Sequence, residues 1–309
     1  AINFQGTFVS SGMFPNFKEK LHTMHDKSLG FDHEVPQGGY QLYGGEAKFN
    51  GNIHLDNRGL RSKGQIDYLS THVSSTDFVF YPDSVIARGN RAFMNEEQHG
   101  SVVFPQGTFP DFQMRWYPKE DKLKLKNLRD PFNFYDSTAQ LEGEITLSKE
   151  GLHGTGKLET RNTELFSKDM NFTGQEFSAR HSKFLVNTAN PEKPALSGED
   201  VRIRFDLDDN YAIVSPEVQG VAAIDFPYAQ FKTSITKARW DLKTNVITME
   251  KDPDVALEDS YFYTTRKDLD SLSFNAEKAE YDMNKQELKV SGIPYIIVAD
   301  AKMCSEILV

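Results

Sequence analysis

An internal repeat is the feature that most constrains what this chain can fold into. Residues 43–88 align without a gap on residues 135–180, at a constant offset of 92 residues, and fourteen of the 46 paired positions are identical. A repeat on this scale is typical of modular, elongated proteins built from stacked units. It predicts an architecture and indicates no function. The identical pairs include Tyr43/Tyr135, Gly51/Gly143, Gly59/Gly151, Gly64/Gly156, Ser75/Ser167, Asp77/Asp169, Phe80/Phe172 and Arg88/Arg180.

Alternation of polar and apolar residues predicts strands throughout the chain. It is clear in residues 52–55, 144–147, 201–205 and 271–274, and a period of two is typical of a strand with one buried face. Asparagine, aspartate and glycine separate these runs, as turns require. No stretch of about 12 residues keeps a helical period. The sequence therefore predicts an all-β fold.

A second, finer repeat predicts three hairpins of the same register. Each has an aromatic residue at position zero and apolar residues at −2, +7 and +9, with a polar segment between. This spacing is typical of two short antiparallel strands whose apolar side chains share one face. The three sets are Met114/Trp116/Leu123/Leu125, Ala238/Trp240/Ile247/Met249 and Ala279/Tyr281/Leu288/Val290.

Together the repeats predict antiparallel hairpins stacked as an elongated open jelly roll or a β-solenoid-like sheet. We expect three modules, at residues 1–100, 101–190 and 191–309. The first two are β repeat modules, and the third contains two of the three hairpins.

Composition excludes some classes of function. The chain has 309 residues and a formal net charge of −10, and no basic patch is evident, which argues against nucleic acid as a partner. The single cysteine, Cys304, excludes an internal disulfide and a Cys-x-x-Cys metal site. No apolar run approaches the ~20 residues that span a bilayer. The chain opens without methionine and ends on the apolar residues 307–309. We therefore expect a mature secreted protein or, as the end favours, a fragment.

The last hairpin resembles a known family repeat. Residues 274–282 read FNAEKAEYD, residues 286–292 read QELKVSG, and residues 294–301 read PYIIVADA. This segment is similar to the repeat of the OstA-like lipopolysaccharide-transport proteins of the bacterial periplasm, and the chain is also similar to segments of large bacterial envelope proteins. The resemblance covers about the last third of the chain. It implies a folded-over β jelly roll with an apolar groove for acyl chains, and a place in the cell envelope.

Five aromatic residues are the candidates for a ligand-binding groove: Phe80, Trp116, Phe172, Trp240 and Tyr281. Repeated hairpins place their large side chains in a line, and such a line on an open face would bind lipid or sugar. The alternative interpretation is that these side chains form the core.

No catalytic or metal-binding pattern is found. His22, His25 and His33 lie near one another with two aspartates, but they match no zinc motif. Residues 206–210 place acids as a calcium loop begins, and then lack the required glycine and glutamate, so a hairpin turn is expected there. No nucleophile elbow, phosphate loop or dinucleotide fingerprint occurs. We expect no catalytic residue, no metal and no cofactor.

The expected function is a non-enzymatic structural or carrier module of the bacterial envelope that binds acyl chains. The expected partners are lipid or lipopolysaccharide and other envelope proteins that join through sheet edges, and the expected location is the periplasm, the outer membrane or the exterior. An extracellular adhesion or glycan-binding module is the alternative. A hydrolase on a β-solenoid scaffold is a third hypothesis, and it requires clustered acids on one face.

Overall fold

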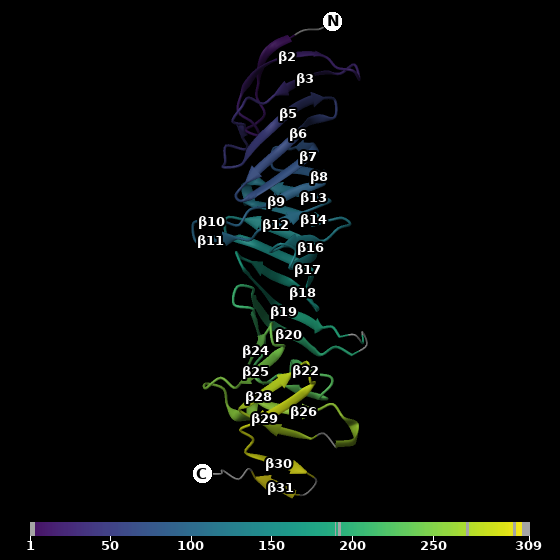
Figure 1. Ribbon diagram of the computed structural model, residues 1–309. Coiled ribbons are helices and arrows are strands. Elements are labelled where there is room, and N and C mark those ends of the chain that lie inside the picture. The colour runs from purple at the N-terminus through teal and green to yellow at the C-terminus, as the bar shows by residue number, and fades with distance from the viewer. Residues whose placement is uncertain (1–3, 189, 191–192, 270–271, 299–300, 305–309) are drawn as a thin grey trace. The chain divides into compact units, whose positions relative to one another are not determined.

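The computed structural model describes residues 4–188, 190, 193–269, 272–298 and 301–304 (Figure 1). Their regular structure is almost entirely antiparallel β-strand, with three single-turn 3-10 helices and, in these residues, no α-helix. The all-β, antiparallel prediction is confirmed. No helix in the described residues is long and apolar enough to span a membrane. Residues 1–3 and 305–309, on which the expectation of a fragment depends, lie outside the description, as do Ala299 and Asp300 of the family-like segment.

The chain divides into two compact units. Unit 1 comprises Ala1–Gly154 and Phe172–Gly174, and unit 2 comprises Thr155–Asn171 and Gln175–Val309. The two units were not defined from the repeat boundaries, so they do not test the three predicted modules. The modules therefore stay a prediction from the sequence repeats.

The strands of unit 1 are mostly short, with four of nine or ten residues among them. They are β1 (Phe4–Phe8), β2 (Phe17–Thr23), β3 (Leu29–Glu34), β4 (Tyr40–Gln41), β5 (Lys48–Asp56), β6 (Gly59–Tyr68), β7 (Thr71–Phe80), β8 (Val85–Gly89), β9 (Arg91–Met94), β10 (Glu97–His99), β11 (Val102–Phe104), β12 (Gly107–Phe109), β13 (Phe112–Tyr117), the 3-10 turn η1 (Pro118–Glu120), β14 (Lys122–Asn127), β15 (Phe132–Phe134) and β16 (Ala139–Ser148).

Two strands, β17 (Gly151–Thr160) and β18 (Thr163–Phe172), contribute residues to both units. Unit 2 continues with β19 (Glu176–Val186), β20 (Leu196–Asp206), β21 (Tyr211–Pro216), β22 (Ile224–Phe226), β23 (Phe231–Thr233), β24 (Lys237–Asp241), β25 (Val246–Glu250), η2 (Leu257–Asp259), β26 (Tyr261–Thr264), η3 (Lys267–Leu269), β27 (Ser273–Asn275), β28 (Lys278–Asp282), β29 (Glu287–Ser291), β30 (Tyr295–Val298) and β31 (Ala301–Cys304).

The sequence repeat is also a structural repeat. Strands β6 and β17 begin at repeat-related residues, and so do β7 and β18. The hydroxyl of Tyr43 donates to the carbonyl of Tyr81 at 2.6 Å. The hydroxyl of its repeat partner, Tyr135, donates to the carbonyl of Thr173 at 2.9 Å. Residues 81 and 173 differ by the same offset, so the repeat preserves individual hydrogen bonds as well as strand positions.

Close approach of two backbones explains a conserved pair of glycines in the repeat. Gly51 of β5 lies directly opposite Gly64 of β6, two strands that run side by side in Figure 1. A Cβ on Gly51 would lie 2.2 Å from the carbonyl oxygen of Lys63. Gly51 has a φ of 147°, and its repeat partner Gly143 has a φ of 158°. Only glycine fits such a position without a backbone shift.

Unit 1 contains a closed ring of eight antiparallel strands. Strand β7 pairs with β8 near its end and with β9 near its start, so two rows of paired strands begin at β7. Both rows end at β16, which pairs with β14 of one row and β15 of the other. The rows are closed by the remaining pairs, and the order around the ring is β7, β8, β13, β14, β16, β15, β12 and β9. The interior contains the buried rings of Phe109, Phe112, Phe132 and Phe134.

Unit 2 forks in the same way and has no such closure among its described strands. Strand β20 pairs with β21 over residues 201–206 and with β22 over residues 197–198. One arm continues through β24, β25, β28 and β29, and the other through β23, β26 and β27. The arms meet inside, where the ring of Phe226 lies 4.8 Å from that of Tyr281.

Among its described strands unit 2 is open, whereas in unit 1 eight strands of the antiparallel sheet close into a ring. The reason is the length of β16, whose ten residues pair with β14 through Glu144–Leu147 and with β15 through Ala139–Leu141.

We expect Gly51→Ala to destabilise the protein by about 2–4 kcal/mol, because the new methyl group meets a carbonyl oxygen at a strained φ. Gly45→Ala is the matched control, since its nearest neighbour would be 3.6 Å away and its φ is ordinary. Urea unfolding of both variants measures the difference. Equal stabilities would contradict the close approach of β5 and β6.

Candidate functional site

The three predicted hairpins have the predicted register. Strands β13 and β14 pair Trp116 with Leu123, and β24 and β25 pair Trp240 with Ile247. Strands β28 and β29 pair Tyr281 with its partner at +7. In each hairpin the residues at −2 and +9 are also directly opposite. Cross-strand pairs of this kind stabilise a sheet by roughly 0.2–1 kcal/mol each.

In unit 2 these pairs join into one continuous row across seven strands. Each member lies directly opposite the next, from β19 through β20, β21, β24, β25 and β28 to β29. All but the last are buried. We call this set the apolar row: Phe177, Phe205, Ala212, Trp240, Ile247, Tyr281 and Leu288.

A shorter row with the same construction crosses unit 1. Phe80 pairs with Val85, Val85 with Trp116, Trp116 with Leu123, and Leu123 with Leu147. All five side chains are buried. The hairpin of Trp116, like that of Trp240, thus has buried apolar side chains directly opposite it on the strands at both sides.

All five aromatic residues proposed for a groove are buried, and none forms an exposed patch. Phe80 is 4% exposed, Phe172 1%, Tyr281 0%, and both tryptophans 2%. Phe172 stacks on Phe134 within unit 1, with ring centroids 4.6 Å apart. The structure thus places these side chains in the interior, as the alternative interpretation expects, and a ligand-binding role for them remains a prediction.

Both tryptophans bury an indole N–H that has no hydrogen-bond partner among the described residues. Most buried donors in proteins are satisfied, and an unsatisfied one costs about 1–3 kcal/mol. Tyr281 differs, because its hydroxyl donates to the carbonyl of Ala195 at 3.2 Å. The two indoles are therefore the polar atoms in these rows with spare hydrogen-bonding capacity.

The apolar row is less covered at its β29 end. Leu288 of β29 and Val290 beside it are only half-buried, whereas Tyr281 on the preceding strand is fully buried. On the other arm, Phe274 of β27 is also half-buried, although it stacks on Phe262. In the described residues β27 and β29 pair with no further strand beyond them. Unit 2 thus presents apolar side chains at the end of both arms.

Trp116 also lines a cavity of about 240 Å³ in unit 1. Its indole ring contacts Tyr43 edge-on and Tyr68 at a tilt, with ring centroids 5.6 Å and 5.5 Å away. The hydroxyl of Tyr68 donates to the carboxylate of Asp121, which also accepts the backbone N–H of Lys149. Burial, the largest influence, raises the pKa of the Tyr43 hydroxyl above its usual range.

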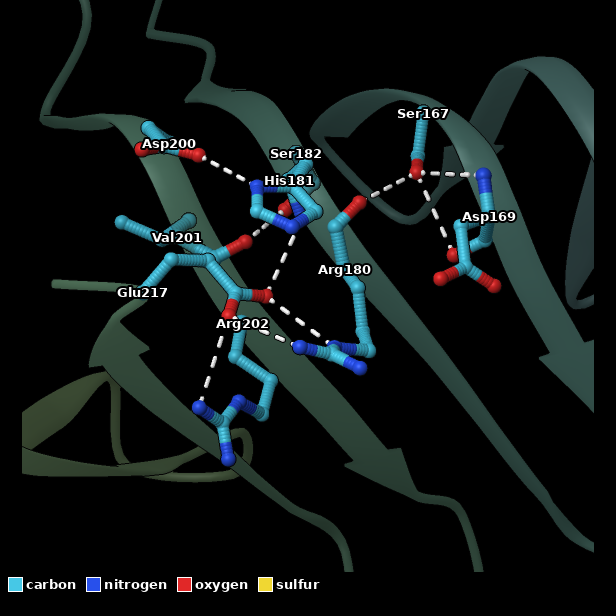
Figure 2. A network of polar contacts seen from close by, with 9 residues as sticks. All are labelled: Ser167, Asp169, Arg180, His181, Ser182, Asp200, Val201, Arg202 and Glu217. Carbon is cyan, nitrogen blue, oxygen red and sulfur yellow. Dashed lines mark hydrogen bonds and ion pairs between the residues drawn. The ribbon is translucent and has the colours of Figure 1, made fainter.

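A cluster of polar side chains marks the fork in unit 2 (Figure 2). Between Ala179 and Ser182 the strand β19 gains a residue relative to β20, and the next step gives β20 the extra residue. His181 and Asp200 have positive φ angles of 45° and 53°, and their side chains lie 2.8 Å apart. These two bulges bend the strands where β20 changes its partner from β22 to β21.

Glu217 holds this bend together. Its carboxylate is 3% exposed and accepts the backbone N–H of His181 at 3.1 Å. It also accepts Arg180 and Arg202, each at 3.4 Å (Figure 2). Ser167 adds a further bond from β18, because its hydroxyl donates to the carbonyl of Arg180 at 2.6 Å. The cluster therefore links the residues around both bulges.

The surroundings of Glu217 lower its pKa. Burial, the largest single influence, raises it, but the His181 N–H and the guanidinium groups of Arg180 and Arg202 together outweigh burial. Three groups thus hold the carboxylate as an anion, and it forms the centre of a network of ion pairs and hydrogen bonds.

Unit 1 carries a counterpart of this cluster at the repeat-related positions. Ser75 donates to the carbonyl of Arg88 at 2.6 Å, as Ser167 does to that of Arg180. Asp111 lines the same hollow as Arg88 and forms an ion pair with Arg129. A carboxylate from outside each repeat thus lies near the final arginine of that repeat. The sequence analysis did not identify Asp111 or Glu217. The Ala-Arg pair that ends both repeats was the available signal for the arginines beside them.

Of the histidines considered for metal binding, His22 and His25 line one hollow and His33 lies apart from them. His33 contacts Glu19 and Tyr40, whereas His22 lies near a backbone carbonyl. The described residues contain no group of three or more histidine, cysteine or acidic side chains with the geometry to hold a metal ion. Asp206 ends β20, and residues 207–210 form the turn to β21, as the sequence predicts.

One histidine in unit 1 lies between two carboxylates. Nδ1 of His54 is 2.6 Å from Asp32 and Nε2 is 3.2 Å from Asp56. Asp56 in turn accepts the Nε–H of Arg58 at 2.8 Å. The hydrogen bond with Asp32 is the main reason why the pKa of His54 is raised, against the effect of burial. Asp32 and His54 are directly opposite on β3 and β5, so this contact ties the two strands together.

Comparison with known proteins identifies no relative. No protein-family model matches the chain, and no curated protein and no solved structure is significantly similar to it. The resemblance to OstA-like proteins therefore remains a prediction from the sequence.

We expect Glu217→Gln to lower the unfolding free energy by about 1–3 kcal/mol at neutral pH, because two arginines lose their anionic partner. The pKa of Glu217 is lowered in the folded state, so its contribution is present above the unfolded pKa and is lost as pH falls through the folded pKa. The gap between wild type and variant should narrow in acid. Glu199→Gln, at an exposed glutamate of β20, is the control, and a gap that persists in acid would contradict the ion-pair account.

We expect His54→Gln to act in the opposite pH range. The pKa of His54 is raised, so its stabilising effect is fully present below the unfolded pKa and is lost as pH rises through the folded pKa. Thermal unfolding should show a deficit for the variant at about pH 5.5 that disappears by about pH 8.5. His22, His25 and Asp26 line the same hollow as His54 and are unchanged in this variant. His153→Gln, at an exposed histidine, is the control for the loss of a histidine elsewhere in the chain. A deficit of equal size at both pH values would show that charge is not involved.

Proposed function

We propose that this chain is a non-enzymatic structural or carrier module of the bacterial cell envelope, and that unit 2 binds lipid acyl chains along its apolar row. The observation that carries the proposal is the row itself, in which seven consecutive strands align their apolar side chains on one face. An acyl chain is a long and uniform apolar ligand, and a long, uniform apolar surface complements it.

The half-buried end of the row supports a place of entry. Leu288, Val290 and Phe274 give the ends of both arms an apolar character. The hairpin β30–β31 follows them and exposes Ile297 by 54% and Met303 by 69%. Exposed apolar side chains gathered at one end of a fold are typical of an interaction site. An acyl chain entering there would contact Leu288 first and would displace or extend the packing around Tyr281.

The envelope location and the lipopolysaccharide class of ligand come from the resemblance of residues 274–301 to the OstA-like repeat. Among the described residues, β27 and β29 pair with no further strand, and a strand edge of this kind can pair with a strand of another protein, which supports other envelope proteins as partners. Unpaired edges of this kind are usually covered or paired in a mature assembly.

The cavity beside Trp116 favours one second candidate, a glycan-binding module. Its lining combines Tyr43, Tyr68 and Trp116 with Asp121 and Lys149, so aromatic and charged groups surround about 240 Å³. Sugars have apolar ring faces and hydroxyl groups, and such a lining suits both. A glycan array separates this candidate from the lipid carrier.

The two tryptophans allow a direct test of acyl-chain binding. Trp116→Phe leaves Trp240 as the only tryptophan, and Trp240→Phe leaves Trp116 as the matched control. With brominated fatty acid, we expect quenching of Trp240 fluorescence in the first variant and little change in the second, because Trp240 belongs to the row of unit 2. Mass spectrometry of material extracted from the purified protein should also reveal an amphiphile. No quenching of Trp240 together with no extracted amphiphile would overturn the proposal.

A further inference from the structure

In unit 1, the outer face of the Trp116 hairpin carries a hollow that is separate from the buried side chains described above. In a strand, alternate residues point to opposite faces. The residues between the buried ones on β13, β14 and β16 therefore face outward, where they line a hollow of about 570 Å³. The lining is largely charged, and its charged members are Arg115, Glu120, Lys122, Lys124, Lys126 and Glu144.

Four of these side chains are basic and two are acidic, in a chain whose net charge is −10. A local excess of positive charge on an acidic protein needs a reason. The alternation of lysine with leucine over residues 122–126 is the sequence signal for it. Sequence reasoning found no basic patch, because Arg115 joins these lysines only through the pairing of β13 with β14.

Two of the basic side chains are in direct conflict. Arg115 of β13 lies directly opposite Lys124 of β14, and like charges in this position destabilise a sheet. Lys124 has one compensating contact, with Glu144 at 3.2 Å. Arg115 is exposed, and its side chain forms no hydrogen bond or ion pair with the residues that the structure describes. The guanidinium group therefore faces the hollow with its donors free.

The corresponding face of unit 2 shows that the hairpin does not require this conflict. Arg239 occupies the position of Arg115, but Thr248 lies opposite it, and its guanidinium group stacks 3.6 Å above the ring of Tyr211. Lys289 occupies the position of Lys124, and Glu280 lies opposite it. Neither Arg239 nor Lys289 thus lies directly opposite another cation.

We propose that the hollow of unit 1 binds a multiply charged phosphate group, with Arg115 and Lys124 as its main ligands. A guanidinium group matches two phosphate oxygens at once, and a lysine beside it adds a point charge. A bound anion would remove the repulsion between the two cations. The phosphate belongs either to a lipid headgroup or to a soluble phosphate ester. This inference does not rest on the proposed acyl-chain function, because it concerns an outer face of unit 1, whereas the apolar row lies in unit 2.

Titration with pyrophosphate by isothermal calorimetry, and sedimentation with phosphatidylcholine vesicles that contain phosphatidic acid, test the two sources. We expect Arg115→Gln and Lys124→Gln each to weaken binding about tenfold, and binding by wild type to fall as salt rises. Arg239→Gln and Lys289→Gln, at the matched positions of unit 2, should bind as wild type does.

A stability measurement separates a binding role from a structural one. Without anion, Arg115→Gln should unfold at the same temperature as wild type or higher, because it removes a like-charge contact and breaks no partner. Pyrophosphate should raise the melting temperature of wild type and not that of the variant. Binding of pyrophosphate alone would assign a soluble ester, and binding of vesicles would assign a lipid headgroup. Absence of both, or equal loss in the unit 2 variants, would overturn the proposal.

Discussion

Contact between apolar side chains in directly opposite strand positions is the interaction on which the rest of unit 2 depends. Trp240, Ile247 and Tyr281 each face the next across a strand boundary, and the same relation extends in both directions. Each such pair stabilises the sheet modestly, but a register slip of one residue would move every member to the solvent face. The row therefore fixes the register of all seven strands together.

The polar clusters have a different effect. They stabilise the bends at which one strand changes its pairing from one arm of the sheet to the other. At the fork of unit 2 the bulges at His181 and Asp200 change the direction of β19 and β20. A bulge leaves backbone groups without partners in the ladder. Glu217 accepts one of them, the N–H of His181, and also forms ion pairs with two arginines. Unit 1 repeats the arrangement with Arg88 and Asp111 lining one hollow. The network in Figure 2 thus accounts for the bend of β19 and β20 at the fork.

The sequence predicts the hairpins well because local rules determine them. A period of two and a short polar turn set Trp116 opposite Leu123, with no reference to the rest of the chain. The forks were not predicted, since bulges at non-glycine residues such as His181 leave no clear signal. Closure of the ring on β16 also escaped prediction, because it depends on pairing between distant strands. The basic hollow was missed for the same reason, as Arg115 and Lys124 meet only in the folded sheet.

Cross-linking across β25 and β28 tests the register of the apolar row most directly. Thr248 and Glu280 are directly opposite on the outer face, so cysteines at these positions, in a chain with Cys304→Ser, should oxidise readily to a disulfide. Thr248 paired with a cysteine at Asp282, two residues along the same face, should oxidise poorly. Efficient oxidation of the first pair alone is the predicted result. Preferential oxidation of the displaced pair would show that Ile247 and Tyr281 do not share a row.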